Sequence, residues 1–452
     1  RGGARTVGVV PAEAAVSFRA DGCPADEPMS HRHAMYALRR RIYALVLRAL
    51  RDDAEAMRQA LASDDALFHE ELYTYMIAHG KTSELLSTPT PFLEDFLQGT
   101  PVLLDGQSLE TYERRLRDLL WQWYVRQGEY LAAAQTLDAL AHTDTYALHL
   151  YERIEYLALA VGNAKSVRQT AAYDLVGFAT QLEEDLEVAQ VQAKILSALP
   201  PVETLELDDT REHTRETAAL LDRSLMDITT LYRHVAEPFG LLEEQLLILH
   251  TAQYHDASLV ASLWEALVAR EHNASAPAQA HRAVAALVTD VYVRLGGSHI
   301  ACAVDIVLSL LERYAYDTYV VAQLGEQPAP SSLHWHAFTK GAGLPPGWAP
   351  RVLLEAGAPP DALFHVLQGL LSTAPAPWNT HTGVGYLLPD LADLVDAWLR
   401  RAEHDRHVRF PAHEVEQALN DAVLQLTTRR FTRTDDALDA RIEHIQALVH
   451  RA

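Results

Sequence analysis

The longest stretch of this chain without proline runs from Val102 to Leu199, and it is filled with helical patterns. Four of them follow one another, at 108–127, 129–142, 146–161 and 172–198. Proline removes a backbone donor and clashes inside a helix, so its absence leaves these helices uninterrupted. Between Asp118 and Lys165 the apolar residues spread around much of each helix, so each needs a helix on both sides. We therefore predict an all-α fold, an irregular α-helical solenoid of stacked helix pairs.

The rest of the chain divides by composition and by its prolines. Residues 1–28 are rich in Gly, Pro, Ala and Asp and are predicted to be a loose leader. Residues 29–325 are predicted to be the main α-solenoid. Eleven of the 21 prolines fall between Pro328 and Pro411, so 326–452 is predicted to be a C-terminal solenoid segment with shorter, more broken helices.

The predicted helices outside the proline-free stretch follow the same 3.6-residue periodicity. No strand alternation of useful length appears, and the helix pairs share no repeat consensus. With 452 residues the chain could hold three domains by length, but a stacked array has no such limit on its size. The predicted helices are 31–51, 92–98, 211–223, 225–236, 238–252, 256–271, 276–295, 299–315, one that starts at Pro359-Pro360, 411–428 and 433–450.

Charge and cysteine content exclude several classes of function. With 61 acidic and 38 basic residues the net charge is −23, so a nucleic-acid surface is not expected. The two cysteines, Cys23 and Cys302, do not have the spacing of a disulfide framework or a zinc site. No run of about 18 apolar residues occurs and no signal peptide precedes the fold, so no membrane span is predicted. The start at Arg1-Gly-Gly3 without methionine suggests a piece of a longer protein.

Residues that could carry chemistry are scattered. Among the 22 histidines the tightest pairs are His31 with His33 and His334 with His336. Their i, i+2 spacing does not place two ligands on one helical face. Gly296-Gly297-Ser298 is interpreted as a helix end followed by a capping serine rather than a nucleophile turn. We expect no enzyme activity, no cofactor, no metal site and no small-molecule substrate.

One early segment, Phe68 to Ile77, carries aromatic residues on two sides. At about 100° per residue Phe68 and Tyr75 share one side, whereas Tyr73 lies roughly opposite. An interior helix of the stack explains this pattern, and so does a helix that receives a partner's peptide on one side. The candidate peptide-binding residues are Phe68, Tyr73 and Tyr75.

Six blocks of this sequence, in order, resemble the C-terminal α-solenoid of the inner-ring scaffold nucleoporins, the one-fifty-five/one-seventy family of the nuclear pore complex. The first two are Leu67-Phe-His-Glu-Glu-Leu-Tyr-Thr-Tyr-Met-Ile77 and Thr90-Pro-Phe-Leu-Glu-Asp-Phe-Leu97. The central blocks are 118–141 and Arg153-Ile-Glu-Tyr-Leu157 with Asn163-Ala-Lys165. The last are 184–192 and 246–264. Each block alone is an ordinary helix pattern, but six in the family's order are hard to obtain by chance.

The resemblance implies a non-enzymatic scaffold of the nuclear pore at the nuclear envelope that supports transport of proteins and mRNA. It implies partners among other nucleoporins, bound through linear motifs in disordered linkers, notably the family with Gly-Leu-Phe-Gly repeats. A solenoid groove with several such sites would bind through avidity. The family also has an N-terminal β-propeller, which this sequence lacks, and membrane contact is expected only through that propeller.

Two other classes of function remain open from the sequence. The first is a helical-solenoid subunit of a vesicle coat or tethering complex, which shares the architecture and differs in its partners. The second is an all-α enzyme, which would need a deep pocket with an ordered metal or cofactor.

Overall fold

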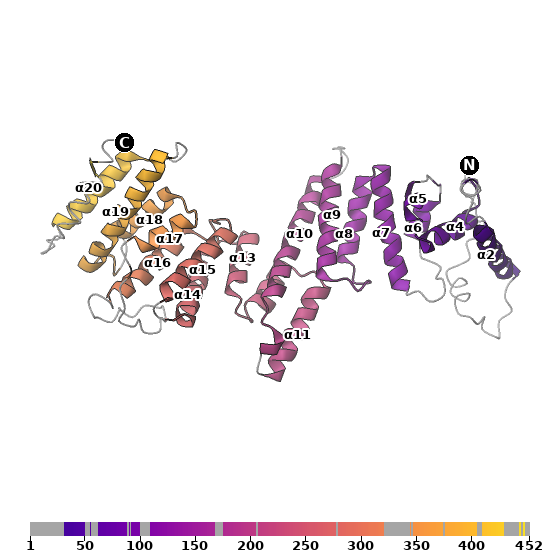
Figure 1. Ribbon diagram of the computed structural model, residues 1–452, viewed down its shortest axis with the longest axis horizontal. Helices are drawn as coiled ribbons and strands as arrows, with labels where there is room; N and C mark the ends of the chain where they lie inside the picture. Colours follow the sequence, from indigo (N-terminus) through magenta and orange to yellow (C-terminus); the bar gives the residue numbers. More distant parts are fainter. Residues whose placement is uncertain are drawn as a thin grey trace. The chain divides into compact units, whose positions relative to one another are not determined.

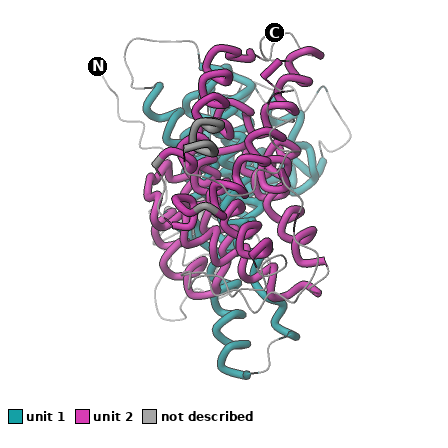
Figure 2. The backbone as a smooth tube through the Cα atoms, turned by 90° about the vertical axis from the view of Figure 1, so that its left-hand side faces the viewer, with its two compact units in different colours: residues 1–227 teal, residues 228–452 magenta. Residues whose placement is uncertain are grey.

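The computed structural model describes residues 31–49, 55, 62–87, 90, 92–99, 109–167, 175–204, 207–276, 279–320, 344, 347–373, 376–404, 409–428, 443, 446 and 447. Every regular element in these ranges is a helix (Figure 1). In the same ranges no helix is both long enough and apolar enough to cross a bilayer. The chain forms two compact units, residues 1–227 and 228–452 (Figure 2). The all-α prediction is confirmed for the described residues.

The first unit is a succession of helices, most of which pack on a neighbour in the sequence. In chain order its elements are α2 (His31–Ala49), α4 (Ala66–Ala78), α5 (Thr82–Ser87), α6 (Leu93–Gln98), α7 (Leu109–Gln127), α8 (Tyr130–His142), α9 (Leu150–Ser166), α10 (Leu175–Ala198), the 3₁₀ turn η1 (Val202–Thr204) and α11 (Asp208–Arg223). Figure 1 shows α7 to α10 side by side, and consecutive members of this run are in contact. This sequential packing is the arrangement that the proline-free stretch predicts.

Two hydrophobic clusters fill the first unit, and α8 contributes to both. One cluster joins α4, α5 and α6 to α7, and the other joins α8, α9 and α10. Ala133 lies in the first and its neighbour Ala134 in the second. The indole of Trp121 on α7 packs against both. The two-sided apolar pattern of α8 is thus explained by a core on each side.

The second unit has one hydrophobic cluster that runs from α13 to α20. Its elements are α12 (Ile228–Thr230), the π-helical turn η2 (Leu231–Ala236), α13 (Leu242–Thr251), α14 (Ala257–Ala274), α15 (Ala280–Arg294), α16 (Val304–Tyr319), α17 (Trp348–Glu355), α18 (Pro360–Thr373), α19 (His381–His404) and α20 (Ala412–Thr428). Here α16 packs on α14, α17, α18 and α19, so it is the central helix of this unit.

Most predicted helices match, but two differ, and the first difference has a clear physical cause. Helix α9 begins at Leu150 rather than at residue 146. The backbone N–H of His149 donates to Oε2 of Glu152 at 2.9 Å, half of a capping box that fixes the helix start. The pattern at 225–236 predicts one helix, whereas the chain forms the short α12 followed by η2.

The expectation of short, broken helices between Pro328 and Pro411 is wrong for α19, which has 24 residues and contains Pro389. Proline costs about 3 kcal/mol inside a helix. Helix α19 buries Leu387, Leu391, Val395 and Trp398, and each buried apolar side chain contributes about 1.5–3 kcal/mol. Burial therefore outweighs the local preference. The pair Gly383 and Gly385 also lies within α19.

Ser298 has the role that its sequence predicts. Gly296 and Gly297 adopt φ values of 60° and 64° after α15. The hydroxyl of Ser298 then accepts hydrogen bonds from the backbone N–H groups of Ile300 and Ala301, both at 3.2 Å. It caps a turn that precedes α16 rather than α16 itself.

Several predictions concern residues outside the described ranges. These are the leader 1–28, the histidine pair at 334 and 336, and most of the predicted helix 433–450. The predicted boundary between 325 and 326 also falls in an interval that the structure does not describe. The three-part division of the chain therefore stays a prediction.

Candidate functional site

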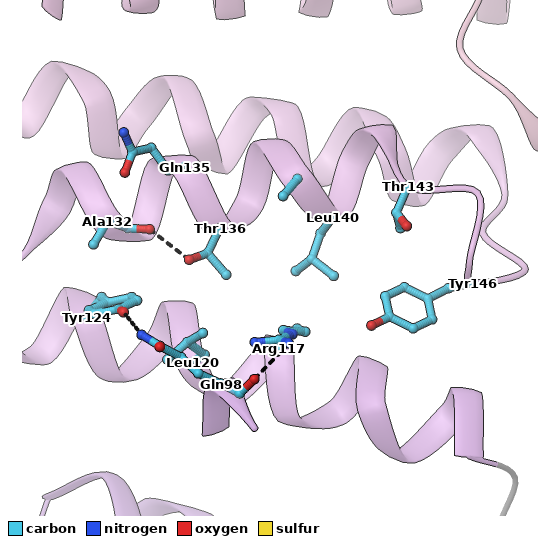
Figure 3. Close-up of a pocket in the computed structure, with 11 residues that line it drawn as sticks. Gln98, Arg117, Leu120, Tyr124, Ala132, Gln135, Thr136, Leu140, Thr143 and Tyr146 are labelled. Atoms are coloured by element: carbon cyan, nitrogen blue, oxygen red, sulfur yellow. Dashed lines mark hydrogen bonds between the residues drawn. The ribbon is translucent and has the colours of Figure 1, made fainter. Parts of the chain in front are cut away.

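A pocket of ≈ 570 Å³ lies between α6, α7 and α8 in the first unit (Figure 3). We call it the α7–α8 pocket. Its size falls within the range of about 300–1,000 Å³ that is typical of ligand sites. Its lining residues are Gln98, Arg117, Leu120, Tyr124, Ala132, Gln135, Thr136, Ala139, Leu140, Thr143 and Tyr146.

A tight turn sets the two long walls of the pocket. Helix α7 ends at Gln127 and α8 starts at Tyr130, with Gly128 at φ 80° between them. The N–H of Gly128 donates to Val125 at 3.1 Å and that of Glu129 to Tyr124 at 2.9 Å, which satisfies the last carbonyls of α7. A side chain at position 128 would disfavour this left-handed conformation, so glycine is required here.

Four of the six residues that α8 and the position after it contribute to the pocket have small side chains. Ala132, Thr136, Ala139 and Thr143 recur at helical spacing and line the pocket together. Thr136 directs its hydroxyl back to the carbonyl of Ala132 at 2.8 Å, so its methyl group is free to contact a ligand. With the buried Leu120 and Leu140 they give the pocket an apolar floor.

The opposite wall is polar. Gln98 donates to the hydroxyl of Tyr124 at 2.7 Å, and that hydroxyl donates to Oε1 of Glu94 at 2.9 Å. The guanidinium of Arg117 donates to the carbonyls of Leu97 (3.4 Å) and Gln98 (3.0 Å) at the end of α6. These bonds hold Arg117 at the edge of the pocket, where its charge can meet an acidic group.

Tyr146 closes one end of the pocket. It lies in the irregular segment after α8, and Figure 3 shows its ring directed toward the space between α7 and α8. Burial raises the pKa of its hydroxyl, and so does the nearby carboxylate of Glu113. The hydroxyl therefore stays protonated at neutral pH and can donate a hydrogen bond to a ligand.

The three residues that the sequence nominates lie on α4, away from this pocket. Tyr73 is wholly buried and Phe68 is 8% exposed, and both belong to the first cluster. Burial raises the pKa of Tyr73 to about 12. Tyr75 is half-buried and stacks on the exposed His79 with ring centroids 4.0 Å apart. Of the three, only Tyr75 has a side chain that is partly exposed. The assignment of these residues to peptide binding stays a prediction.

Sequence reasoning did not find the pocket. Trp121, Trp123 and Tyr124 lie in or against the hydrophobic clusters of the first unit. Tyr124 also lines the pocket. The signal in the sequence was the row of Ala and Thr along 132–143. Their side chains are too small to fill the space between α8 and α7.

One group of side chains among the described residues has the spacing of metal ligands. It consists of Asp138, His142 and Asp185, and the possible ligand atoms lie within 4.8 Å of one another. The pair His31 and His33, whose spacing argues against a metal site, lies in α2, and the two side chains are outside the described set. The buried Cys302, with a pKa raised to about 12 by burial, is not placed to act as a ligand.

The fold defines the class of protein, an α-helical solenoid. The sequence matches the family described as non-repetitive/WGA-negative nucleoporin C-terminal over residues 8–434. This chain belongs to that family.

Curated relatives agree with the family match. The chain is 24% identical to the probable nucleoporin C890.06 of Schizosaccharomyces pombe over 432 residues, which is 91% of this chain and 29% of that protein. It is 34% identical to the nuclear pore complex protein Nup154 of Drosophila melanogaster over 204 residues, 45% of this chain and 14% of that protein. The chain thus spans less than a third of the length of these relatives.

Solved structures confirm the solenoid fold. The crystal structure of Chaetomium thermophilum Nup170 SOL has a TM-score of 0.72 at 24% identity and covers 97% of this chain and 56% of that chain. The crystal structure of the Nup170 CTD–Nup145N complex from the same organism has a TM-score of 0.68 at 23% identity, with 96% and 84% covered.

Proposed function

We propose that this chain is the C-terminal solenoid of a scaffold nucleoporin of the inner ring of the nuclear pore complex, at the nuclear envelope. In this role it holds short linear segments of other nucleoporins and thereby supports nucleocytoplasmic transport. The observation that carries the proposal is the family match over residues 8–434 of an all-helical chain. The same match favours a nucleoporin over a subunit of a vesicle coat, and the proposal assigns the chain no reaction.

The Chaetomium complex supports the choice of ligand. In that structure a chain of the same fold is bound to Nup145N, which is another nucleoporin. By likeness of fold, we assign this chain a linear nucleoporin segment as ligand, and nucleoporins with Gly-Leu-Phe-Gly repeats as the source of such segments. Charge supports a protein partner over a nucleic acid, since the chain carries a net charge of −23.

The α7–α8 pocket is the binding site that the geometry supports best. Its small wall residues let a peptide backbone approach α8 closely, and its floor of Leu120 and Leu140 suits an aliphatic side chain. Arg117 at the rim suits an acidic residue of the same segment. The exposed edge of α4 at Tyr75 and His79 is a second candidate surface, separate from the pocket.

The test is binding of fluorescent nucleoporin segments to the full chain by anisotropy. Ala139→Trp fills the pocket from its exposed wall, and Ala158→Trp makes the same change at an exposed position of α9 that does not line it. We expect at least one segment to bind the wild type and the Ala158→Trp variant equally and to lose affinity for Ala139→Trp.

Two other outcomes contradict parts of the proposal. If no segment from any nucleoporin binds the wild-type chain, the peptide-holding role is wrong. If a segment binds all three proteins equally, the role stands but the α7–α8 pocket is not the site.

A further inference from the structure

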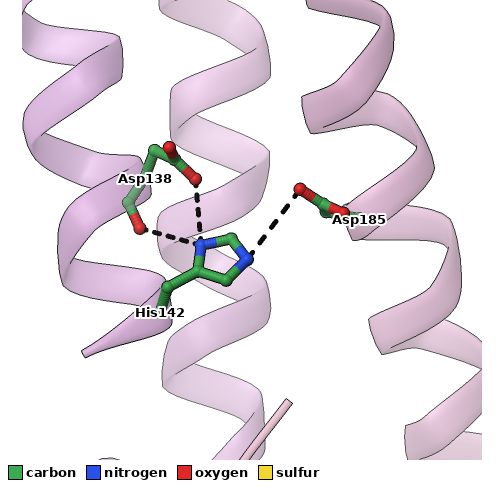
Figure 4. A group of neighbouring side chains, drawn as sticks. All are labelled: Asp138, His142 and Asp185. Atoms are coloured by element: carbon green, nitrogen blue, oxygen red, sulfur yellow. Dashed lines mark hydrogen bonds and ion pairs between the residues drawn. The ribbon is translucent and has the colours of Figure 1, made fainter. Parts of the chain in front are cut away.

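Helices α8 and α10 flank α9, and a chain of three side chains connects them across it (Figure 4). Asp138 and His142 lie one turn apart on α8, and Asp185 lies on α10. The spacing i, i+4 puts the first two on one face of α8. The cluster is partly exposed, with His142 at 44% and Asp185 at 28%, so an ion from solvent can reach it.

The ring of His142 is held by Asp138 through one nitrogen. Its Nδ1 lies 2.9 Å from Oδ1 of Asp138 and 3.1 Å from the carbonyl oxygen of the same residue. Since both are acceptors, Nδ1 carries the proton in the neutral ring. The lone pair of Nε2 then points away from α8, toward α10. A carboxylate that fixes a histidine in this way is the usual companion of a metal-bound imidazole.

Asp185 is oriented as firmly from the other side. Its Oδ1 accepts a hydrogen bond from Nε2 of Gln181 at 2.9 Å. Its Oδ2 faces Nε2 of His142 at 3.8 Å. This distance is longer than the roughly 2.7–3.2 Å of a hydrogen bond. In the neutral ring, therefore, two electron-pair donors face each other across a gap with no proton between them.

We propose that Nε2 of His142 and Oδ2 of Asp185 bind a divalent transition-metal ion of the zinc type, with Asp138 and Gln181 holding the two ligands in place. Zinc bonds of about 2.0–2.1 Å to nitrogen and 2.0–2.2 Å to oxygen place the two atoms about 3.4 Å apart at a tetrahedral angle. The observed 3.8 Å needs only a few tenths of an ångström of side-chain movement. Water completes the coordination at the exposed side.

The donor set selects the ion. An imidazole nitrogen suits Zn²⁺, Ni²⁺ or Cu²⁺, whereas Ca²⁺ and Mg²⁺ prefer oxygen ligands alone.

An ion bound to His142 and Asp185 would link α8 to α10. Helix α8 also forms the small-residue wall of the α7–α8 pocket. The ion would thus fix a wall of that pocket from behind. The metal site does not depend on the proposed function, because its ligands lie outside the pocket.

The test is calorimetric titration of the full chain with Zn²⁺ at pH 7.5, with His142→Gln and Asp185→Asn as variants. His149→Gln is the matched control, because His149 also meets one aspartate, Asp222, at 2.6 Å but has no third member among the described residues. We expect one zinc equivalent to be lost in both variants and kept in the control. Asp138→Asn, which removes the carboxylate that holds the ring, is expected to weaken binding by about 10–100-fold.

The difference between wild type and variant is the quantity that decides, because zinc bound by any other histidine contributes equally to both titrations. Circular dichroism shows whether each variant is folded, and the partial exposure of all three positions makes unfolding unexpected. Identical titrations for wild type and His142→Gln overturn the proposal.

Discussion

The guanidinium of Arg153 donates a hydrogen bond to the backbone carbonyl of Arg223 at 2.6 Å, although the two residues are 70 positions apart in the sequence. The same side chain, 2% exposed, also donates to the carbonyls of Ala141 at 2.6 Å and Thr143 at 3.0 Å. One arginine on α9 thus satisfies the C-terminal ends of α8 and α11. Its hydrogen-bond partners are carbonyls, whereas the exposed carboxylate of Asp144 lies farther away, at 3.9 Å. Burial lowers the pKa of Arg153.

Replacement of this arginine tests its role as a shared helix cap. Arg153→Met leaves three carbonyls without their donor, and each unsatisfied buried group costs about 1–3 kcal/mol. We expect the free energy of unfolding to fall by about 3 kcal/mol or more. Urea unfolding measures the loss, and hydrogen exchange locates it at the ends of α8 and α11.

Arg215→Met is the control for charge and size. Arg215 on α11 is 62% exposed and pairs with the side chain of Glu212 on the same helix. We expect a change within about 0.5 kcal/mol. An equal loss in the two variants would show that Arg153 acts through its charge alone.

A second prediction concerns two buried acids in the second unit. Glu312 on α16 and Asp390 on α19 are both 0% exposed. Burial raises the pKa of Glu312 well above its usual value, and nearby Asp390 raises it further. Burial also raises the pKa of Asp390 to about 6, although it accepts a hydrogen bond from the N–H of Gly347 at 2.5 Å. The phenol of Tyr386 adjoins this pair, and burial raises its pKa too.

The folded state therefore holds protons that the unfolded chain releases near pH 4. The contribution of this pair to stability is fully present below that pH and is lost as the pH rises through about 6 and beyond. Over this range the free energy of unfolding falls by about 1.4 kcal/mol per pH unit for each proton. Glu312→Gln keeps the shape, removes one such proton and should flatten this dependence. The measurement is the urea midpoint from pH 4.5 to 7.5. Asp305→Asn, at an exposed position of the same helix, should keep the slope.

A third prediction separates packing from binding on α4. Tyr73→Ala leaves a cavity in the first cluster and should cost about 3–5 kcal/mol. Tyr75→Ala removes a half-buried ring that stacks on His79 and should cost less. If α4 contacts a nucleoporin segment, Tyr75→Ala weakens that binding while the melting temperature changes little. Unchanged binding to Tyr75→Ala rules out this surface.

How far the sequence could predict the structure depends on the range of the interactions involved. Local signals were enough for α7, α8 and α10, because their apolar periodicity and the absence of proline act within each helix. The start of α9 depends on a hydrogen bond to the side chain of Glu152. Helix α19 continues past Pro389 because it is buried against α16, α17 and α18. Neither effect is visible in a local window.

The site was harder to predict for the same reason. Gln98, Arg117 and Tyr146 reach the α7–α8 pocket from three different segments, and no motif joins them. Phe68 and Tyr73 are candidates from the sequence because the two-sided pattern of 68–77 fits an interior helix and a peptide-binding helix alike. In α4 they supply the core. The periodicity showed two apolar sides, but it did not show that each was already covered by another helix of the chain.

A fourth prediction concerns a glycine that the fold requires. Gly347 precedes α17 at φ 75°, and a Cβ there would lie 2.5 Å from Oδ2 of Asp393 and 2.9 Å from its Cβ. Gly240 has φ 62°, and a Cβ at that position would meet no other atom within 4 Å. Gly240→Ala should therefore cost about 1 kcal/mol for the backbone alone. Gly347→Ala should cost at least twice as much, and thermal unfolding compares the two.

Trp121 has a consequence for how the first unit responds to load. Its indole packs against the cluster of α4 to α7 and against that of α8 to α10. In stacked-helix arrays cooperativity passes through neighbour interfaces. Because the side chain of Trp121 contacts both clusters, unfolding of one cluster removes contacts that stabilise the other. The two halves of this unit should therefore unfold together when the protein is stretched, and Trp121→Ala should divide one force peak into two.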